Sequence, residues 1–342
     1  MSLLIKGVSR LSQLIIDCDK DWQEYPISNI GAPPADKDVL ARGLPDIYSC
    51  DYGLKWADLG VIAGRIRNMA YLGNGIAVLG DENGHVFRST NYGATWVDLG
   101  VISSTYIQGM AYLGNGIAVL GDANAHVFRS TNYGATWADL GVVAAGLIDT
   151  MAYLGNGIAI LGDAAWHVFR STNYGATWAD LGVIGTSDAL IMVYLGNGIA
   201  VLGDGNGRIF RSTDYGLNWA DLGVIGTTIY GMACLGNGIA ILGDRNRHVY
   251  RSTDYGLNWA DLGVVAAGSI RGMAYLGNGI AVLGAEDWHV YRSTDYGANW
   301  ADLGVIASNW VWTIAYLGNG ITILGDDAGH VFRSTSAFQL WR

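Results

Sequence analysis

An eight-residue segment, Ser89-Thr90-Asn91-Tyr92-Gly93-Ala94-Thr95-Trp96, recurs along the 342-residue chain. Its tryptophan occupies seven positions spaced 40 or 41 residues apart: Trp56, Trp96, Trp137, Trp178, Trp219, Trp259 and Trp300. Short segments rich in apolar and β-branched residues lie between the copies, and glycine-containing turns separate them. Repeats of about 40 residues with strand-like content are typical of β-propellers, in which each repeat folds into one blade.

The first complete repeat predicts four strands, at residues 66–72, 76–80, 85–89 and 96–100. The second is apolar and β-branched, as expected of a buried strand, and the third alternates with period two. The segment Leu-Gly-Asn-Gly joins the first two strands in a tight turn. Asp81-Glu82-Asn83-Gly84 is expected to turn the chain between the second and third strands, since Asn-Gly supplies the positive φ that a two-residue hairpin needs.

The number of strands predicts how the ring closes. The first-strand motif occurs seven times, six repeats are complete, and the last (Val311 to Ser334) lacks a fourth strand. Residues 56–60 supply one unpaired fourth strand near the N-terminus. We therefore predict an all-β, seven-bladed propeller of four-stranded antiparallel blades over residues 46–342. The N-terminal strand completes the last blade, which removes an open sheet edge.

Residues 1–45 form a separate piece of sequence that contains all four prolines. Pro33-Pro34 favours extended backbone, because proline fixes its own φ and restricts the preceding residue. We interpret residues 1–45 as an N-terminal arm or linker. It could lie across the propeller or connect it to a larger assembly such as a fibre or virion appendage.

The octet resembles the Asp-box, or bacterial neuraminidase repeat, with the pattern Ser-x-Asp-x-Gly-x-Thr-Trp. Sialidases, xyloglucan-cleaving glycosidases, sortilin receptors and photosystem II assembly factors carry this box, so the resemblance implies the fold and no single activity. We expect its Asp or Asn to bond nearby backbone amides, its glycine to take positive φ and its tryptophan to pack between blades. These structural positions are Asp51, Asn91, Asn132, Asn173, Asp214, Asp254 and Asp295, with Trp56, Trp96, Trp137, Trp178, Trp219, Trp259 and Trp300.

Composition excludes several function classes. The formal charge of −10 argues against nucleic acid and anionic membranes, which need a basic surface. No apolar run reaches the length of a membrane span, and the three cysteines form no metal motif. No signal peptide is recognisable, and the compartment stays open, with an extracellular or virion-associated location favoured over the cytoplasm. We expect no metal and no cofactor, and a monomer.

The repeats differ from one another on one side only. In an antiparallel blade, the first and third connections lie on one face of the ring and the other two on the opposite face. The first connection (Leu-Gly-Asn-Gly) and the third (the octet) are nearly identical in all repeats, which defines a uniform face. The other connections differ from repeat to repeat and define a variable face, where we expect a ligand site.

The candidate ligand-binding residues stand where the innermost strands begin on the variable face and at the loop tips around them. They are Arg65, Arg67, Tyr106, Gln108, Asp149, Asp188, Tyr230, Arg271, Trp310 and Trp312, with Trp166 and Trp288 at the tips. Period-two alternation puts them on one side of each strand, around the mouth of the central channel. Aromatic rings can stack on sugars, and charged groups can bind hydroxyls or an acid.

Two further sets repeat once per blade. The six histidines open the third strand, with Arg208 at that position in the fourth blade. We expect each to be a local hydrogen-bond partner, since they stand too far apart to share a metal. The arginines of the third strand are expected to form a solvated or inter-blade salt-bridging band, with the fourth-strand aspartates as candidate partners: Asp58, Asp98, Asp139, Asp180, Asp221, Asp261 and Asp302.

Three function classes remain open. We favour a non-catalytic, lectin-like module that binds glycans on the variable face. One alternative is a protein-interaction or structural propeller of a fibre or virion-like assembly. Another is a sialidase-like glycoside hydrolase, for which Tyr230 and the arginines offer suitable residue types. We assign no catalytic residue, because the Arg-Ile-Pro motif of such enzymes is absent and Glu82 and Glu286 are expected to lie too far from Tyr230.

Overall fold

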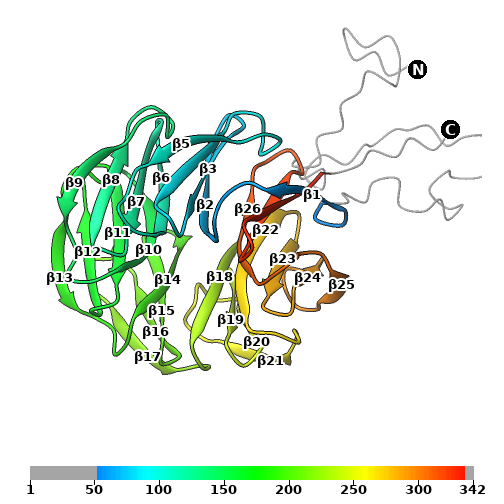
Figure 1. The fold of residues 1–342 in the computed structure, drawn as a ribbon. Helices are drawn as coiled ribbons and strands as arrows, with labels where there is room; N and C mark the ends of the chain where they lie inside the picture. Colours follow the sequence, from blue (N-terminus) through cyan, green and yellow to red (C-terminus); the bar gives the residue numbers. More distant parts are fainter. Residues whose placement is uncertain (1–51, 336–342) are drawn as a thin grey trace, which may run out of the picture. The chain divides into compact units, whose positions relative to one another are not determined.

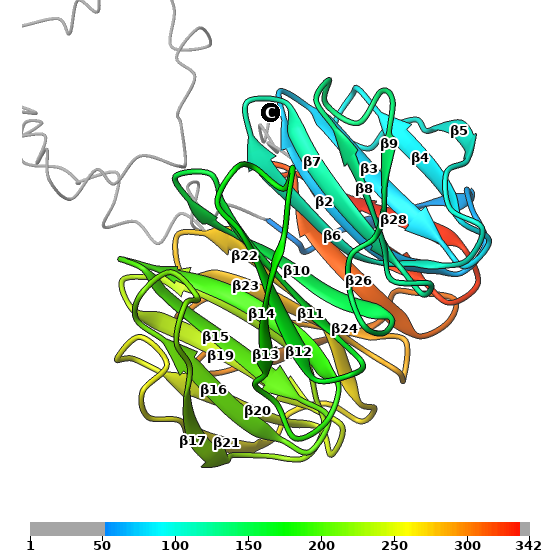
Figure 2. The same cartoon turned by 90° about the vertical axis from the view of Figure 1, so that its left-hand side faces the viewer.

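The computed structural model describes residues 52–335, which form 28 strands in seven four-stranded antiparallel sheets. The sheets are arranged as blades around a central axis (Figures 1 and 2). This architecture confirms the predicted seven-bladed propeller. The N-terminal arm assigned to residues 1–45 and Asp51 of the first box lie outside the described residues.

Each blade contributes one strand to each of four positions from the axis outward. The innermost strands are β2 (Ile66–Gly73), β6 (Ile107–Gly114), β10 (Ile148–Gly155), β14 (Ala189–Gly196), β18 (Ile229–Gly236), β22 (Ile270–Gly277) and β26 (Val311–Tyr316). The second strands are β3 (Ile76–Asp81), β7 (Ile117–Asp122), β11 (Ile158–Asp163), β15 (Ile199–Asp204), β19 (Ile239–Asp244), β23 (Ile280–Ala285) and β27 (Thr322–Asp326).

The two outer positions follow the same order. The third strands are β4 (His85–Ser89), β8 (His126–Ser130), β12 (His167–Ser171), β16 (Arg208–Ser212), β20 (His248–Ser252), β24 (His289–Ser293) and β28 (His330–Ser334). The outermost strands are β5 (Val97–Val101), β9 (Ala138–Val142), β13 (Ala179–Val183), β17 (Ala220–Val224), β21 (Ala260–Val264), β25 (Ala301–Val305) and β1 (Trp56–Val61). The predicted strands agree with these bounds to within one residue.

The last blade combines the two ends of the described chain. Strand β1 pairs antiparallel with β28, and Trp56 lies opposite Ser334 while Val61 lies opposite His330. The sheet order is β1-β28-β27-β26. The N-terminal strand therefore completes the seventh blade, as predicted, and covers the edge that β28 would otherwise expose.

The hydrophobic core lies between neighbouring blades. One cluster joins Leu72 and Val78 of the first blade to Ile107 and Leu120 of the second, all fully buried. Gly80 on β3 permits this contact, because a Cβ there would lie 2.7 Å from the Ile107 side chain. A glycine in each second strand thus lets the next blade approach closely.

Turn geometry corrects one prediction. In the β2–β3 turn both Asn74 (φ 53°) and Gly75 (φ 76°) have positive φ, as a two-residue hairpin requires. In the β3–β4 connection only Gly84 does, and its amide bonds to the Asp81 carbonyl at 3.4 Å. The predicted turn over residues 81–84 is present, but its geometry is not that of a two-residue hairpin, because Gly84 alone has positive φ.

The box has the expected structural role. Gly93 takes positive φ, and Trp96 packs against the cluster that contains Leu317 and Ile323 of the neighbouring blade. The amide of Tyr92, also in this box, bonds to the carbonyl of Gly75, which joins the two connections of the uniform face. No helix able to cross a membrane occurs among residues 52–335.

Candidate functional site

A cavity of about 250 Å³ opens at the axis of the propeller, between the innermost strands. We call its outer ring the channel mouth, formed by one residue per blade: Arg67, Gln108, Asp149, Leu190, Tyr230, Arg271 and Trp312. Below these lie apolar side chains that include Met69, Met232, Met273 and Ile314. The cavity therefore joins a polar and aromatic rim to an apolar floor.

Arginine side chains cover several aromatic faces at the mouth. The guanidinium carbon of Arg271 lies 4.3 Å from the ring centre of Tyr230 and 4.1 Å from that of Trp312. The guanidinium of Arg67 lies 4.3 Å from the ring centre of Tyr106. Such cation–π contacts hold the guanidinium planes in fixed positions. The ring faces of Tyr106 and Tyr230, which we had predicted to stack on a ligand, therefore already contact arginines.

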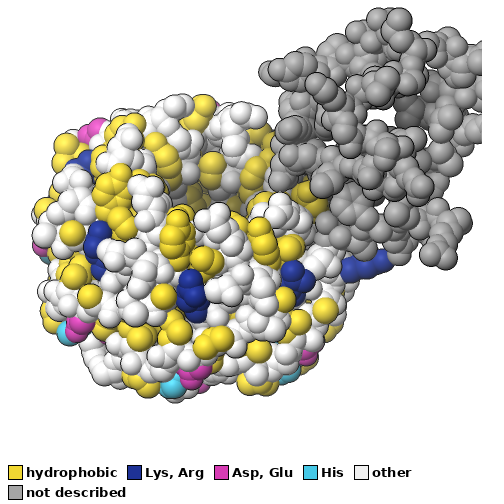
Figure 3. All heavy atoms as spheres, turned by 90° about the horizontal axis from the view of Figure 1, so that it is seen from above, with side chains coloured by type: hydrophobic (Ala, Val, Ile, Leu, Met, Phe, Trp, Pro, Cys, Tyr) yellow, Lys and Arg dark blue, Asp and Glu magenta, His cyan; other side chains and the backbone are white. Residues whose placement is uncertain are grey.

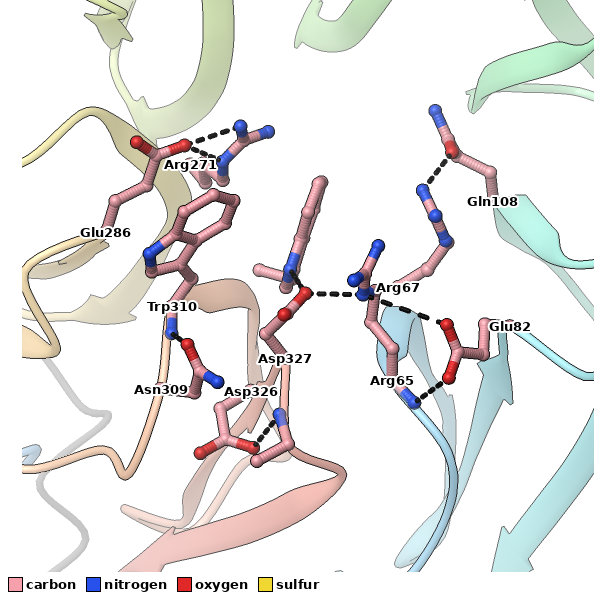
Figure 4. Close-up of polar contacts among 12 residues, drawn as sticks. Arg65, Arg67, Glu82, Gln108, Arg271, Glu286, Asn309, Trp310, Asp326 and Asp327 are labelled. Atoms are coloured by element: carbon pink, nitrogen blue, oxygen red, sulfur yellow. Dashed lines mark hydrogen bonds and ion pairs between the residues drawn. The ribbon is translucent and has the colours of Figure 1, made fainter.

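Acidic side chains fix two of the three arginines. The Nη2 of Arg271 lies 2.5 Å from Oε1 of Glu286. Arg65 stands between Asp327, at 2.5 Å, and Glu82, at 3.8 Å (Figure 4). Each acid stands just after a second strand, next to the start of its own innermost strand. Both positive charges are thus neutralised locally.

Arg67 has a different environment. Its Nη1 donates to Oε1 of Gln108 at 3.1 Å, and Nε2 of Gln108 donates to Oδ1 of Asp149 at 2.5 Å. Gln108 of the second blade therefore links the guanidinium of Arg67 on the first blade to the carboxyl group of Asp149 on the third. Two buried atoms at the ends of this chain, Arg67 Nε and Asp149 Oδ2, have no hydrogen-bond partner among the described residues.

Asp149 is the acid among the seven channel-mouth residues, and its pKa is strongly raised. It is 6% exposed. Burial, together with the negative charges of Asp188 and Asp163, raises the pKa of Asp149 to about 7, while Arg67 and Gln108 act in the opposite direction. Burial also lowers the pKa of the Arg67 guanidinium, with a further contribution from the charge of Arg65. A carboxyl group that changes charge near neutral pH inside a cavity is a common feature of functional sites.

Three predicted tryptophans lie on the surface. Trp166 and Trp288 are each 44% exposed and Trp310 is 40% exposed. Trp166 (φ 74°) and Trp288 (φ 72°) end the turns between second and third strands in the left-handed region, where three other blades have glycine. A bulky residue rarely adopts this conformation, so the backbone at these two tips is strained. Glycine, which occupies the position in three other blades, would avoid this strain.

The structure brings most of the candidate residues together. Arg67, Gln108, Asp149, Tyr230, Arg271 and Trp312 line the cavity. Arg65, Tyr106 and Trp310 contact members of this ring, and Asp188 acts on Asp149 through its charge. Trp166 and Trp288 stand apart at the loop tips. Whether these residues bind a ligand stays a prediction.

Sequence reasoning missed Asp327. Its Oδ1 accepts a hydrogen bond from Nε1 of Trp312 at 2.6 Å and pairs with Arg65. A signal was present, because an acid follows the second strand in three of the four blades with a cationic or aromatic residue at the mouth: Glu82, Glu286 and Asp327. Comparing these two positions across repeats would have indicated the contacts of Arg271 with Glu286 and of Trp312 with Asp327.

The repeated histidines form local pairs on the outside of the blades. Nδ1 of His85 lies 2.9 Å from Oδ2 of Asp98 on β5, and the other histidines pair in the same way. Arg208 takes this role toward Asp221. Figure 3 shows histidines beside acidic side chains at several places on the surface. The prediction of local hydrogen-bond partners is confirmed.

The predicted partners of the third-strand arginines were wrong. Arg88 donates from Nε to the carbonyl of Tyr133, in the box of the next blade, at 2.7 Å. The corresponding arginines repeat this bond: Arg129, Arg170, Arg211, Arg251, Arg292 and Arg333. Six of the seven expected acids pair with histidines and Asp221 pairs with Arg208, and each third-strand arginine joins its blade to the next through a backbone carbonyl.

No group of three or more His, Cys, Asp or Glu residues between positions 52 and 335 is arranged to hold a metal ion.

Solved structures confirm the architecture. A structure described as YCF48 bound to D1 peptide is 15% identical, with a TM-score of 0.68, and the match covers 85% of this chain and 98% of that one. YCF48 from Cyanidioschyzon merolae is 13% identical (TM-score 0.66; 82% and 98% covered), and the WD40 propeller domain of Doa1 is 12% identical (0.68; 81% and 94%). These identities establish the fold alone. No family model and no curated protein matches the chain.

Proposed function

We propose that this protein is a non-catalytic binding module that recognises a segment of a protein partner on its variable face, at the channel mouth. The observation that carries the proposal is the placement of Arg67 and Arg271 against aromatic rings at positions that differ from blade to blade. Differences among otherwise repeated blades are what a single asymmetric ligand requires. Arginine, tyrosine and tryptophan are also the residues that contribute most to protein interfaces.

The fold likeness supports the same choice. One similar propeller is described as bound to a peptide, and it shares this architecture over most of both chains. An apolar floor below a charged rim suits a peptide side chain that enters the cavity while its backbone stays at the rim. We also propose that the octet is an Asp-box, as its sequence resemblance indicates. Its role here is structural, because it forms part of the scaffold that positions the channel mouth.

The test is selection of peptides from a random display library on the purified protein, followed by affinity measurement with fluorescence polarisation. We expect Arg271→Ala to weaken the selected peptides at least tenfold. Leu217→Ala is the matched control, because Leu217 is exposed on the uniform face. Failure to select any peptide, or equal losses in both variants, would contradict the proposal.

Glycan binding is a second candidate, favoured by the exposed Trp166, Trp288 and Trp310. The rings of Trp166 and Trp288 stand apart from the arginines and could stack on sugars, whereas Tyr230, Trp310 and Trp312 contact Arg271. A glycan array with the wild type and Trp288→Ala tests this candidate. The sialidase-like alternative gains no support from the geometry, since Glu286 binds Arg271, the residue stacked on Tyr230.

A further inference from the structure

The chain Arg67–Gln108–Asp149 ends in two hydrogen-bonding atoms that the described residues leave unused. Nε of Arg67 is a donor, and Oδ2 of Asp149 can accept, or donate when it carries a proton. Both atoms are buried, and both side chains line the same cavity. A buried polar atom without a partner costs roughly 1–3 kcal/mol, so a ligand group that bonded to both atoms would recover this cost.

These positions belong to no repeated scaffold. The same position in the other four blades carries Leu190, Tyr230, Arg271 and Trp312, and these residues do not reproduce the Arg67–Gln108–Asp149 chain. The position is therefore free to vary, and the Arg–Gln–Asp chain arises only where three successive blades meet.

We propose that the channel mouth binds a carboxylate group between the Nε–H of Arg67 and a protonated carboxyl of Asp149. The protonated carboxyl of Asp149 donates a hydrogen bond from Oδ2 to one carboxylate oxygen while Arg67 donates to the other. Where Asp149 is ionised in the free protein, binding takes up one proton from solvent at Oδ2. The inference rests on the proposed function and names the group on the partner that this site recognises.

Charge selects this ligand over its alternatives. Asp188 and Asp163 act on Asp149 from the following blade and from β11 and favour its protonated form, while Arg67 opposes them. Arg65 and Arg271 are paired with acids, whereas Arg67 forms no ion pair among the described residues. Nε of Arg65 also donates no hydrogen bond, but Asp327 balances the charge of that guanidinium. Arg67 is therefore the cation that remains for an anionic ligand, and it would repel a cationic one.

The cavity also limits the rest of the ligand. Methionine and isoleucine side chains form its floor, and its volume of about 250 Å³ accommodates a group of the size of one side chain. A compact apolar body that ends in a carboxylate matches both parts. Benzoate is a probe of this kind, and benzamide and benzamidine are its neutral and cationic counterparts of nearly the same shape.

The experiment is an NMR titration of the full chain with these three compounds at pH 6 and pH 8. Benzoate should bind most tightly, and its affinity should fall about tenfold from pH 6 to pH 8 as Asp149 loses its proton. Arg67→Gln should weaken benzoate at least tenfold. Asp149→Asn keeps a donor without a titrating group, so its benzoate affinity should not depend on pH. Asp188→Asn should move the fall in affinity to lower pH, because the charge of Asp188 raises the pKa of Asp149. Leu217→Ala, at an exposed position outside the cavity lining, is the control and should retain the wild-type pH dependence.

Tighter binding of benzamide or benzamidine, no binding of any probe, or a benzoate affinity that is the same at both pH values in the wild type would overturn the inference. The peptide selection is independent of this result. Selected peptides that bind while benzoate does not would refute only the carboxylate site. Benzoate binding with the expected pH dependence, without any selectable peptide, would refute only the proposed function.

Discussion

The hydroxyl oxygen of Ser89 accepts a hydrogen bond from the backbone amide of Gly93 at 2.9 Å, inside the turn between β4 and β5. The same hydroxyl donates to Oδ1 of Asn91 at 2.9 Å, and Ser89 is 1% exposed. Every box from the second blade to the sixth repeats the bond to glycine, through Ser130, Ser171, Ser212, Ser252 and Ser293. The buried serine therefore holds the turn at its centre, while Oδ1 of Asn91 accepts a hydrogen bond from the exposed backbone amide of Thr95 at 2.9 Å.

Ser89→Ala should lower the free energy of unfolding by about 1–3 kcal/mol, because the buried amide of Gly93 would lose its acceptor. Urea denaturation measures the change. Thr90→Ala is the matched control, since Thr90 is exposed in the same turn, and it should change stability by less than about 0.5 kcal/mol. Equal effects of the two substitutions would contradict the structural role of the serine.

Asp149→Asn should stabilise the protein more at pH 8 than at pH 5. The folded-state pKa of Asp149, about 7, lies above the unfolded value, so the native state binds this proton more tightly. Its favourable contribution is present at low pH and is lost as the pH rises toward and through 7. Asparagine cannot ionise, so the stabilisation relative to wild type should reach up to about 4 kcal/mol at pH 8. Denaturant midpoints at both pH values provide the measurement, and a constant difference would refute it.

Trp288→Gly should be more stable than Trp288→Ala by about 1 kcal/mol, because Trp288 has a φ of 72° that glycine adopts without strain. Both variants remove the exposed indole, so the comparison isolates the backbone. Thermal unfolding curves of the pair measure the difference. If the two variants unfold together, the tip is not strained. Reduced ligand binding by both would show that the indole is kept for recognition.

Arg271→Lys should behave like Arg271→Ala in peptide binding, with a loss of at least tenfold. Lysine keeps the charge but not the planar guanidinium that contacts Tyr230 and Trp312 and pairs with Glu286. Fluorescence polarisation of a selected peptide measures the loss. Arg245→Lys, at an exposed loop tip, should retain wild-type affinity. Retained affinity in Arg271→Lys would show that charge alone matters.

The repeats made the fold predictable from the sequence. Trp56 to Gly60 could be assigned to the last blade because seven first strands were matched by six complete repeats and one surplus fourth strand. The ring of channel-mouth residues followed from the same alignment, since period two fixes which side of an innermost strand faces the axis.

Pairings between side chains could not be obtained in this way. Asp98 lies opposite Phe87 in the strand register, between the levels of His85 and Arg88, and sequence alone did not show which of these two it binds. The outcome depends on reach, because the Arg88 side chain extends to the next blade and finds a carbonyl there. The raised pKa of Asp149 was equally inaccessible, since it results from burial and from charges on three separate strands or loops.

The pairing of β1 with β28 imposes an order on folding in the cell. Asp58 and His330 are 272 residues apart, yet they belong to one sheet. Blades one to six each consist of consecutive residues and can assemble while the nascent chain is still emerging from the ribosome. Strand β1 is synthesised before all of them and finds its partner after all of them, so the first of the described strands to be made is the last to be paired.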